Sequence, residues 1–476
     1  MKVTQVALIP SAASQTAGRP ALTPELLAAS GARYSRNNQG LDSILERINP
    51  DNLDASVDSI FRLIDYGHQS IADMAPVAMF IDSISLWLAY HVWTLCPTAG
   101  GQESSTRYIE LQGADTLAPE RLGIPSARQA AFRDMLQRAF AAYREALAAW
   151  SRIGEAAPDL TAIPAALRHD DSDKARRAVD RMLRNYRFDR ARYYLPMAAA
   201  TNMMLVMSAR GWVNLCQHLA SHGLPEAQTL GAAIRAELAL ATPRLLKHAV
   251  AKPGTIAGQR EAFENLSQAA ATEGLPAALQ PDPDGVNPPA ADTVQLDVLM
   301  PPDIPPGRLA ADLAWHDNRY AWIGQDLRRL AVRVDWAAIA MAEIRDLNRH
   351  RTGTKTCPLR PLGFYAALEQ LPEALRDRAD GRRLHALAAE GRAISATAHA
   401  HLAQGDQTSV YDTLLGTQFR FEHVTTADKF IYEAELRTGL GAHFRYAHHL
   451  KDALEAWYAR FPETRGRILE GDAEPE

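Results

Sequence analysis

The pattern of apolar positions predicts long amphipathic helices and only a few short strands. Residues 128–150 carry an apolar side chain every three or four positions, the period of a helix that buries one face. Strand-like patterns are limited to residues 3–9, 76–82 and 330–336. The pattern therefore predicts a helix-rich α+β fold with a small sheet in each half of the chain.

The most apolar stretch, residues 74–96, is long enough to raise the question of a membrane span. Asp82 lies inside it, and a carboxylate at mid-membrane costs roughly 2.5–3.5 kcal/mol. The flanks carry no cluster of Lys or Arg. We therefore expect a buried strand followed by a buried helix, and no membrane partner. The first ten residues contain too short an apolar stretch for a secretory signal.

Prolines indicate where the chain divides. Nine of the 28 prolines lie between Pro276 and Pro306, so this stretch cannot be the interior of a helix. We predict an N-terminal domain at residues 1–270, a Pro-rich linker at 271–307 and a C-terminal domain at 308–476. Residues 294–300 form one possible short strand within the linker.

The charge balance and the cysteine content argue against several classes of protein. The 476 residues include 51 Lys and Arg against 56 Asp and Glu, and a net charge of −5 provides no chain-wide basic field for nucleic acid. The three cysteines lie far apart, which leaves neither a disulfide framework nor a four-ligand zinc site. We expect a cytoplasmic protein with no metal site and no nucleic-acid partner.

The two halves resemble each other weakly. A shift of 253 positions pairs residues 80–108 with residues 333–361, and it aligns Asp82 with Asp335 and Arg107 with Arg360. Four identities in 29 positions are little better than chance. The order of elements carries more weight, because a strand, a helix and a polar loop containing Gly follow one another in both halves.

Those two polar loops carry the most informative chemistry. QESSTRY at residues 102–108 offers hydroxyls, a carboxylate and a guanidinium that could surround an oxyanion, although a solvated surface loop is also compatible. NRHRTGTK at residues 348–355 gathers cations at the end of a predicted helix, where they could simply cap the negative end of the helix dipole.

Together these segments resemble the flavin-dependent thymidylate synthases, whose signature is RHRxxSxNExSxRY. The first half matches it through GHQS at 67–70, QESSTRY, ARYYLP at 191–196, SARGWVN at 208–214 and LASHG at 219–223. The resemblance covers roughly residues 1–245. It implies two tandem thymidylate synthase-like domains, each with a small, mostly antiparallel sheet, that form a pseudo-dimer.

Each half keeps what the other has lost. The first half has Cys96, Pro97 and Thr98 where the family has RHR, and His218 where the family has a later arginine. The second half keeps RHR at residues 349–351 and places Arg445 where the later arginine is expected, but its SxRY segment has become CPLRP. We therefore expect one composite site per chain.

The resemblance implies a set of site residues. Nucleotide contacts are expected from Gln102, Glu103, Ser105, Arg107 and Tyr108. Flavin contacts are expected from Arg349, His350, Arg351, Thr354, His68, Ser70 and Asn214. Arg445 and Glu103 are the expected catalytic residues. Arg192 matches a nucleotide-binding arginine of the family but belongs to the wrong half for the composite site, so Arg420 or Arg437 could replace it.

The chemistry implied is methyl transfer to carbon 5 of dUMP or a close analogue, with methylenetetrahydrofolate as carbon donor, FAD as hydride carrier and NADPH as reductant. Members of this family are similar in forming tetramers, which implies a homodimer of pseudo-dimers. Two alternatives remain open: a diverged flavoenzyme that acts on another small metabolite, and a non-catalytic nucleotide-binding pseudoenzyme.

Overall fold

The computed structural model describes residues 1–35, 40–49, 52–65, 69–281, 288–305 and 307–474. The chain forms two compact units. The first unit comprises Met1–Ser104, Leu117–Gly123 and Ala200–Phe263. The second unit comprises Ser105–Thr116, Ile124–Ala199 and Glu264–Glu476. This division differs from the expected boundary near residue 270, because residues 124–199 of the first half belong to the second unit.

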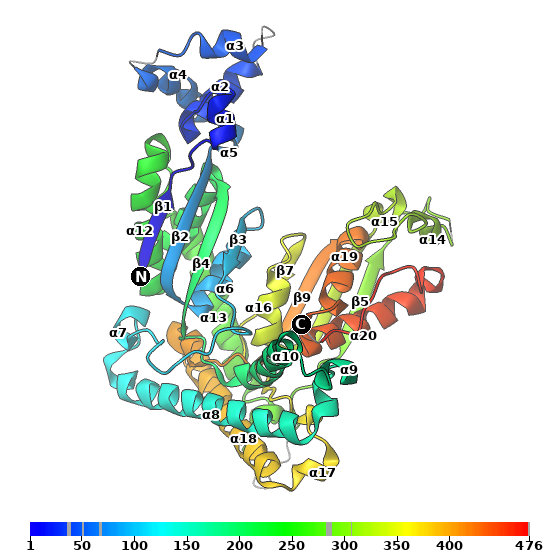
Figure 1. Ribbon diagram of the computed structural model, residues 1–476. Coiled ribbons are helices and arrows are strands. Elements are labelled where there is room, and N and C mark those ends of the chain that lie inside the picture. Colours follow the sequence, from blue (N-terminus) through cyan, green and yellow to red (C-terminus); the bar gives the residue numbers. More distant parts are fainter. Residues whose placement is uncertain (36–39, 50–51, 66–68, 282–287, 306, 475–476) are drawn as a thin grey trace. The chain divides into compact units, whose positions relative to one another are not determined.

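The first unit contains a four-stranded sheet and the helices around it (Figure 1). Its strands are β1 (Lys2–Val6), β2 (Pro76–Ser85), β3 (Gly100–Glu103) and β4 (Ala200–Ser208). Its helices are α1 (Ala12–Thr16), α2 (Pro24–Tyr34), α3 (Gly40–Leu45), α4 (Leu53–Asp65), α5 (Ser70–Asp73), α6 (Leu86–Leu95), α7 (Pro119–Leu122), α11 (Ala209–Ala220), α12 (Pro225–Ala241) and the 3-10 turn η4 (Pro243–Leu245).

The sheet of the first unit is antiparallel, in the order β1-β2-β4-β3. Side chains along β4 alternate between buried and more exposed, as expected for a strand with one face in the core. Residues 76–95 form β2 followed directly by α6, which confirms the strand and helix predicted there. No helix of the described residues is long and apolar enough to cross a membrane.

The second unit contains a second antiparallel sheet. Its strands are β5 (Val294–Leu299), β6 (Ala331–Ala340), β7 (Thr354–Thr356), β8 (Gly363–Phe364) and β9 (Thr417–Thr426). Its α-helices are α8 (Gln129–Ala156), α9 (Ala165–Arg168), α10 (Asp173–Ala191), α14 (Leu309–Asp312), α15 (Gln325–Arg329), α16 (Met341–Asn348), α17 (Glu373–Arg376), α18 (Ala379–Ala403), α19 (Ala427–Thr438) and α20 (Phe444–Arg460). Its 3-10 turns are η1 (Ser126–Arg128), η2 (Pro158–Thr161), η3 (Arg192–Tyr194), η5 (Ala277–Leu279), η6 (Leu368–Gln370), η7 (Gln407–Asp412) and η8 (Pro462–Thr464). Helix α13 (Pro253–Glu273) spans the point where the two units meet in sequence.

The strand order of the second sheet is β5-β6-β9-β7, which repeats the order of the first. Strand β5 confirms the short strand expected within the Pro-rich segment, but it pairs with β6 along its whole length. The segment is therefore part of the second unit's sheet. The expected free linker at 271–307 is replaced there by a folded edge strand.

A shared irregularity aligns the two sheets residue by residue. Strand β2 shifts register between Ile81 and Ile84, and β6 shifts register between Trp336 and Ile339. These positions differ by 255, so the ungapped shift of 253 was wrong by two residues within the strands. Asp82 consequently corresponds to Ala337, not to Asp335. The repeat itself is confirmed by topology, while the identities that first suggested it were largely coincidental.

A pseudo-symmetric contact joins segments of the two halves inside the second unit. Pro196 forms an isolated antiparallel bridge with Leu414. On either side, the Met197 amide donates to the Thr413 carbonyl at 2.9 Å, and the Leu415 amide donates to the Leu195 carbonyl at 2.8 Å. Pro196 and Leu414 are 218 positions apart, and the two flanking hydrogen bonds join their neighbours in the sequence. The same offset of 218 relates the C-terminal ends of β4 and β9. The two segments therefore meet as in an isologous dimer interface.

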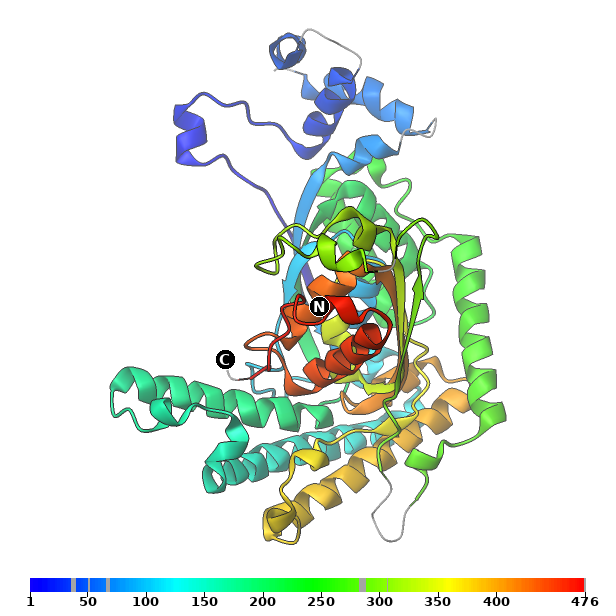
Figure 2. The same ribbon diagram turned by 90° about the vertical axis from the view of Figure 1, so that its right-hand side faces the viewer.

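Long helices from both halves pack together in the second unit, which explains its boundaries. Helix α8 lies against α10 and α18, and α18 also lies against η7 (Figures 1 and 2). Helix α8 buries a continuous apolar stripe that includes Phe132, Phe140 and Trp150, as its periodicity predicted. Burial of this stripe against helices of both halves places residues 124–199 with the second sheet.

Candidate functional site

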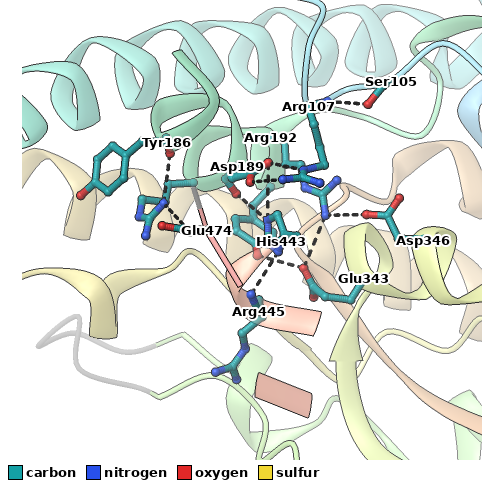
Figure 3. A network of polar contacts seen from close by, with 12 residues as sticks. Ser105, Arg107, Tyr186, Asp189, Arg192, Glu343, Asp346, His443, Arg445 and Glu474 are labelled. Atoms are coloured by element: carbon teal, nitrogen blue, oxygen red, sulfur yellow. Dashed lines mark hydrogen bonds and ion pairs between the residues drawn. The ribbon is translucent and has the colours of Figure 1, made fainter. Parts of the chain in front are cut away.

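Arg107 is held by a buried carboxylate in the second unit. Its Nε and Nη2 donate to the two carboxylate oxygens of Asp189, both at 2.8 Å, and Nη1 donates to the Gly441 carbonyl at 3.0 Å (Figure 3). Ser105 Oγ accepts from the Arg107 amide at 3.2 Å, and Tyr108 is half exposed. Arg107 therefore links a loop of the first half to residues 439–443 of the second.

Arg192 contacts second-half residues as well, so the expectation that it lies in the wrong half for this site is wrong. Its Nη2 lies 3.0 Å from the Asp346 carboxylate on α16. Burial alone would raise the pKa of Asp346, but Arg192 and then Arg437, Arg107 and His443 lower it to about 2. Asp346 is therefore an anion among four cationic or polar groups from both halves.

Glu343 is a fully buried carboxyl one turn before Asp346 on α16. Tyr193 donates its hydroxyl to Glu343 Oε1 at 2.9 Å, and Arg192 lies 3.9 Å from the same oxygen. Burial raises the pKa of Glu343 to about 7, although Arg192 partly offsets this effect. A carboxyl that titrates near neutral pH can hold or release a proton under physiological conditions.

His443 and Arg445 form the second-half wall of this cluster. His443 Nε2 donates to the Asp189 carbonyl at 3.1 Å, while Nδ1 accepts from the Arg445 amide at 3.1 Å. Burial, followed by the charges of Arg192 and Arg107, lowers the pKa of His443 well below its ordinary value, so the ring is neutral. The Arg445 guanidinium lies 4.4 Å above the Tyr365 ring and pairs with Asp292.

The segment that contains RHR lies between α16 and β7. His350 is buried and accepts a hydrogen bond from Arg437 Nε at 2.7 Å. Arg437 also donates to the Asp346 carbonyl at 3.0 Å, which connects this segment to the cluster. Arg349 is half-buried at the end of α16, and Arg351 is exposed. Thr354 begins β7 opposite Val424.

The two alternatives to Arg192 differ in their surroundings. Arg437 reaches the cluster as described above. Arg420 is 54% exposed and binds Asp335 at 2.5 Å on the sheet. Arg437 therefore contacts the cluster, whereas Arg420 lies on the exposed surface of the sheet and pairs with Asp335 there.

Arg445 does not occupy the position expected for the family's later arginine. His218 lies on α11, and the equivalent helix of the second half is α19, which has the same length and also follows directly on the central strand. The equivalent position is Leu436, next to Arg437 on α19, whereas Arg445 lies on the next helix, α20. The expected equivalence of Arg445 with His218 is therefore wrong.

The remaining predicted residues lie in the first unit. Gln102 and Glu103 belong to β3, and Trp93 Nε1 donates to Glu103 at 3.1 Å. Ser70 begins α5. Asn214 lies on α11 and lines a cavity of about 160 Å³ together with Gln69 of the GHQS segment. His68 lies outside the described residues.

Sequence reasoning missed the carboxylates that organise the cluster. They are Asp189, Glu343 and Asp346, all of which are at least half-buried. Asp189 directly precedes the RAR triplet, and an acid on the buried side of α10 was the signal that could have revealed it. Glu343 and Asp346 share one face of α16 at a spacing of three residues.

Comparisons with known proteins agree with the motifs of the first half. The family model described as thymidylate synthase complementing protein matches residues 21–244. The matched residues make up slightly less than half of the chain. The resemblance to flavin-dependent thymidylate synthases is thereby confirmed for this part of the chain.

Two further matches were found. UPF0159 protein Ta1429 of Thermoplasma acidophilum is 24% identical over 243 residues, which are 47% of this chain and 48% of that protein. The chain thus spans about half the length of this curated relative. A solved structure, the UMP/dUMP methylase PolB from Streptomyces cacaoi bound with 5-Br dUMP, aligns with 14% identity and a TM-score of 0.31 over 52% of this chain and 93% of that chain.

Proposed function

We propose that the protein methylates carbon 5 of a pyrimidine nucleotide, dUMP or a close analogue such as UMP, in a flavin-dependent reaction. One observation carries the proposal. Arg107 and Arg192, both on family motifs of the first half, share one buried cluster with Asp346, Arg437 and His443 of the second half. The contacts join residues 154 to 334 positions apart in the sequence, as a composite site requires.

The hydrogen-bond donors of the RHR segment, residues 349–351, suit a dinucleotide cofactor. Arg349 and Arg351 flank the buried imidazole of His350, and guanidinium groups of this kind bind pyrophosphate oxygens. Burial lowers the pKa of His350 to about 3, so the ring stays neutral and accepts from Arg437. These residues would hold FAD, which supplies a hydride when bound.

The clustered arginines have a direct role in this proposal. Attack of carbon 5 on the one-carbon donor requires electron density on the uracil ring, and negative charge then develops on its carbonyl oxygens. Guanidinium groups fixed in advance by Asp189 and Asp346 stabilise such charge without reorganisation. No thiol nucleophile is needed, and burial raises the pKa of the Cys96 and Cys216 thiols to about 12.

The proposed reaction balances as follows. Carbon 5 loses its proton and forms a bond to the methylene carbon of methylenetetrahydrofolate. A hydride that originates from NADPH completes the methyl group. Both bonds between the methylene carbon and the folate nitrogens break, and these nitrogens take up two protons, one equivalent to the proton lost from carbon 5 and one from solvent. The products are the 5-methyl nucleotide, tetrahydrofolate and NADP⁺. Glu343, whose pKa lies near 7, is suited to hold a proton next to Arg192 during these steps.

The experiment follows the proton at carbon 5. dUMP and UMP tritiated at that carbon are incubated with the protein, FAD, NADPH and methylenetetrahydrofolate, and tritium released to water is counted. We expect release from at least one nucleotide. Arg107→Lys, which keeps the charge but loses the bidentate fork, should reduce release by about 100-fold. Absence of release from both nucleotides by a flavin-loaded protein would refute the proposal.

A matched pair of arginine variants tests the composition of the site. Arg437→Ala removes a guanidinium that contacts Asp346 and His350, so tritium release should fall strongly. Arg420→Ala removes an exposed guanidinium bound to Asp335, so release should stay close to that of the unmodified protein. Equal losses in both variants would contradict the assignment of Arg437 to the site.

A further inference from the structure

A cavity of about 440 Å³ in the second unit has charged walls that the proposed function does not explain. Arg190, Arg445 and Lys451 supply its cations. Asp472 and Glu474 face them from the segment at residues 471–474. Of these five side chains, only Arg445 was singled out by a family motif, so the cavity requires an explanation of its own.

Arg190 is a buried part of the wall of this cavity and lies between two aromatic rings. It is only 2% exposed, and its guanidinium carbon lies 3.8 Å from the centre of the Tyr186 ring and 4.4 Å from that of Phe444. The aromatic rings cover the faces of the guanidinium, so that its in-plane N–H groups remain as the binding edge.

That binding edge is only loosely occupied. Nη1 donates to the Tyr186 carbonyl at 3.2 Å and to Glu474 at 3.3 Å, and Nη2 donates to Gln370 at 3.3 Å. Nε is buried and has no hydrogen-bond partner within the described part of the chain. Charge-assisted hydrogen bonds of good geometry are typically about 2.7–2.9 Å long, so a better oxyanion ligand could shorten them.

The segment at residues 471–474 brings its carboxylates to the cavity in an unfavourable backbone conformation. Ala473 and Glu474 have φ angles of 52° and 25°, in the region that residues with a Cβ rarely adopt. The Ala473 amide donates to the Thr438 carbonyl at 2.8 Å, which holds the segment in place. Asp472 reaches Lys451 at 3.2 Å.

The segment therefore resembles a ligand that the protein supplies itself. Without Asp472 and Glu474, the cations Arg190, Arg445 and Lys451 would line the cavity with Glu369 as the remaining acid. The partly buried Glu474 carboxylate, bound to Arg190, and the exposed Asp472 carboxylate, bound to Lys451, would compete with an external anion for these cations as long as the segment stays in place.

We propose that this cavity binds an oxyanion group, a phosphate or a carboxylate of a small molecule, at Arg190 and Lys451, and that Glu474 and Asp472 pair with these two cations in its absence. The inference goes beyond the proposed function, since it assigns a site that the nucleotide motifs do not include. Binding of an external oxyanion displaces the two carboxylates, and the segment at 471–474 acts as a gate.

Isothermal titration calorimetry of the full chain tests this inference, with inorganic phosphate and glutarate as separate probes. The double variant with Asp472→Asn and Glu474→Gln loses both competing charges but keeps the shape of the segment. We expect it to bind at least one probe about tenfold more tightly than the unmodified chain. The probe that gains more identifies the oxyanion as phosphate or carboxylate. Equal affinity of the two proteins for both probes would overturn the inference.

Two lysines that each pair with an aspartate provide a matched control in the double variant. Lys451 pairs with Asp472 and lines the cavity, whereas Lys429 pairs with Asp428 at 3.4 Å and does not line it. Lys451→Ala should abolish the tenfold gain, and Lys429→Ala should preserve it. Equal losses in both variants would show nonspecific ion binding and overturn the inference. The titration requires no turnover, so its failure is distinguishable from a failure of the tritium assay.

Discussion

Glu343 makes the stability of the second unit depend on pH in a way that a single substitution should remove. Burial raises its pKa from 4.5 to about 7. A carboxyl whose pKa is higher in the folded than in the unfolded state binds its proton more tightly when folded. Its contribution is fully present below pH 4.5 and is lost as pH rises through about 7. A shift of this size corresponds to on the order of 3 kcal/mol of unfolding free energy.

Glu343→Gln replaces the protonated carboxyl with a neutral group of the same shape. We therefore expect the variant to gain stability relative to the unmodified protein as pH rises from 5 to 8, by an amount approaching 3 kcal/mol. Urea titrations of both proteins at pH 5, 6, 7 and 8 measure this difference. Parallel pH profiles of the two proteins would refute the assignment of a raised pKa to Glu343.

Glu433→Gln is the control with the opposite sign. Burial would raise the pKa of Glu433, but His350 and then His423 lower it to about 2. Its contribution is present above pH 4.5 and is lost as pH falls through about 2. Glu433→Gln should therefore destabilise the protein at pH 5, where Glu343→Gln has its smallest effect. Unchanged or increased stability of Glu433→Gln at pH 5 would show that the charges around Glu433 were assigned incorrectly.

Two further predictions concern the cluster as a whole. Asp189→Ala leaves Arg107 without its buried carboxylate and should cost about 3 to 5 kcal/mol of unfolding free energy in urea titrations, whereas Arg465→Ala at an exposed ion pair should cause no measurable change. The flavin absorbance of the loaded protein should correspond to about one FAD per chain, because RHR is complete only at residues 349–351, and a ratio near two would contradict this.

Local patterns predicted the elements of the fold well. The period of residues 128–150 gave α8, and the short apolar runs gave β2, β6 and even the edge strand β5. The domain boundary could not be obtained in this way. Proline content reports where helices cannot continue, but it contains no information on which helices share a core. The packing of α8 against α18 decided the boundary, and it is a tertiary contact.

The sequence predicted the cationic residues of the site but not the carboxylates that bind them. Motif spacing located Arg107, Arg192 and the RHR segment, because a family signature records residues that act on a ligand. Asp189 and Asp346 act on those arginines, and their position depends on which helices meet. The error over Arg445 has a similar cause, since a loop of different length before α20 shifted the alignment while α19 kept its register.

The asymmetry of the repeat argues that each chain carries one such cluster. Aligning equivalent strands and the first residues of equivalent helices shows which residues stand at the pseudo-symmetric positions of the other half. The counterparts of Arg192, Glu343, Asp346 and Arg445 are Val410, Leu88, His91 and Glu226, in that order. None of these replacements carries a guanidinium, and only one carries a carboxylate, which accepts from the Ser85 amide and hydroxyl.

Val410 and Leu88 are apolar, Glu226 is satisfied by Ser85, and burial lowers the pKa of His91 to about 3, so that its ring is neutral. Burying an arginine without its carboxylate costs several kcal/mol of folding free energy. Once one residue of the duplicate site is substituted, substitution of its buried charged partners is therefore favoured. Fusion of two halves relieves the constraint that both copies of an interface site share one sequence. The remaining cluster draws Arg107 and Arg192 from one half and Asp346 and His443 from the other, and neither half alone could assemble it.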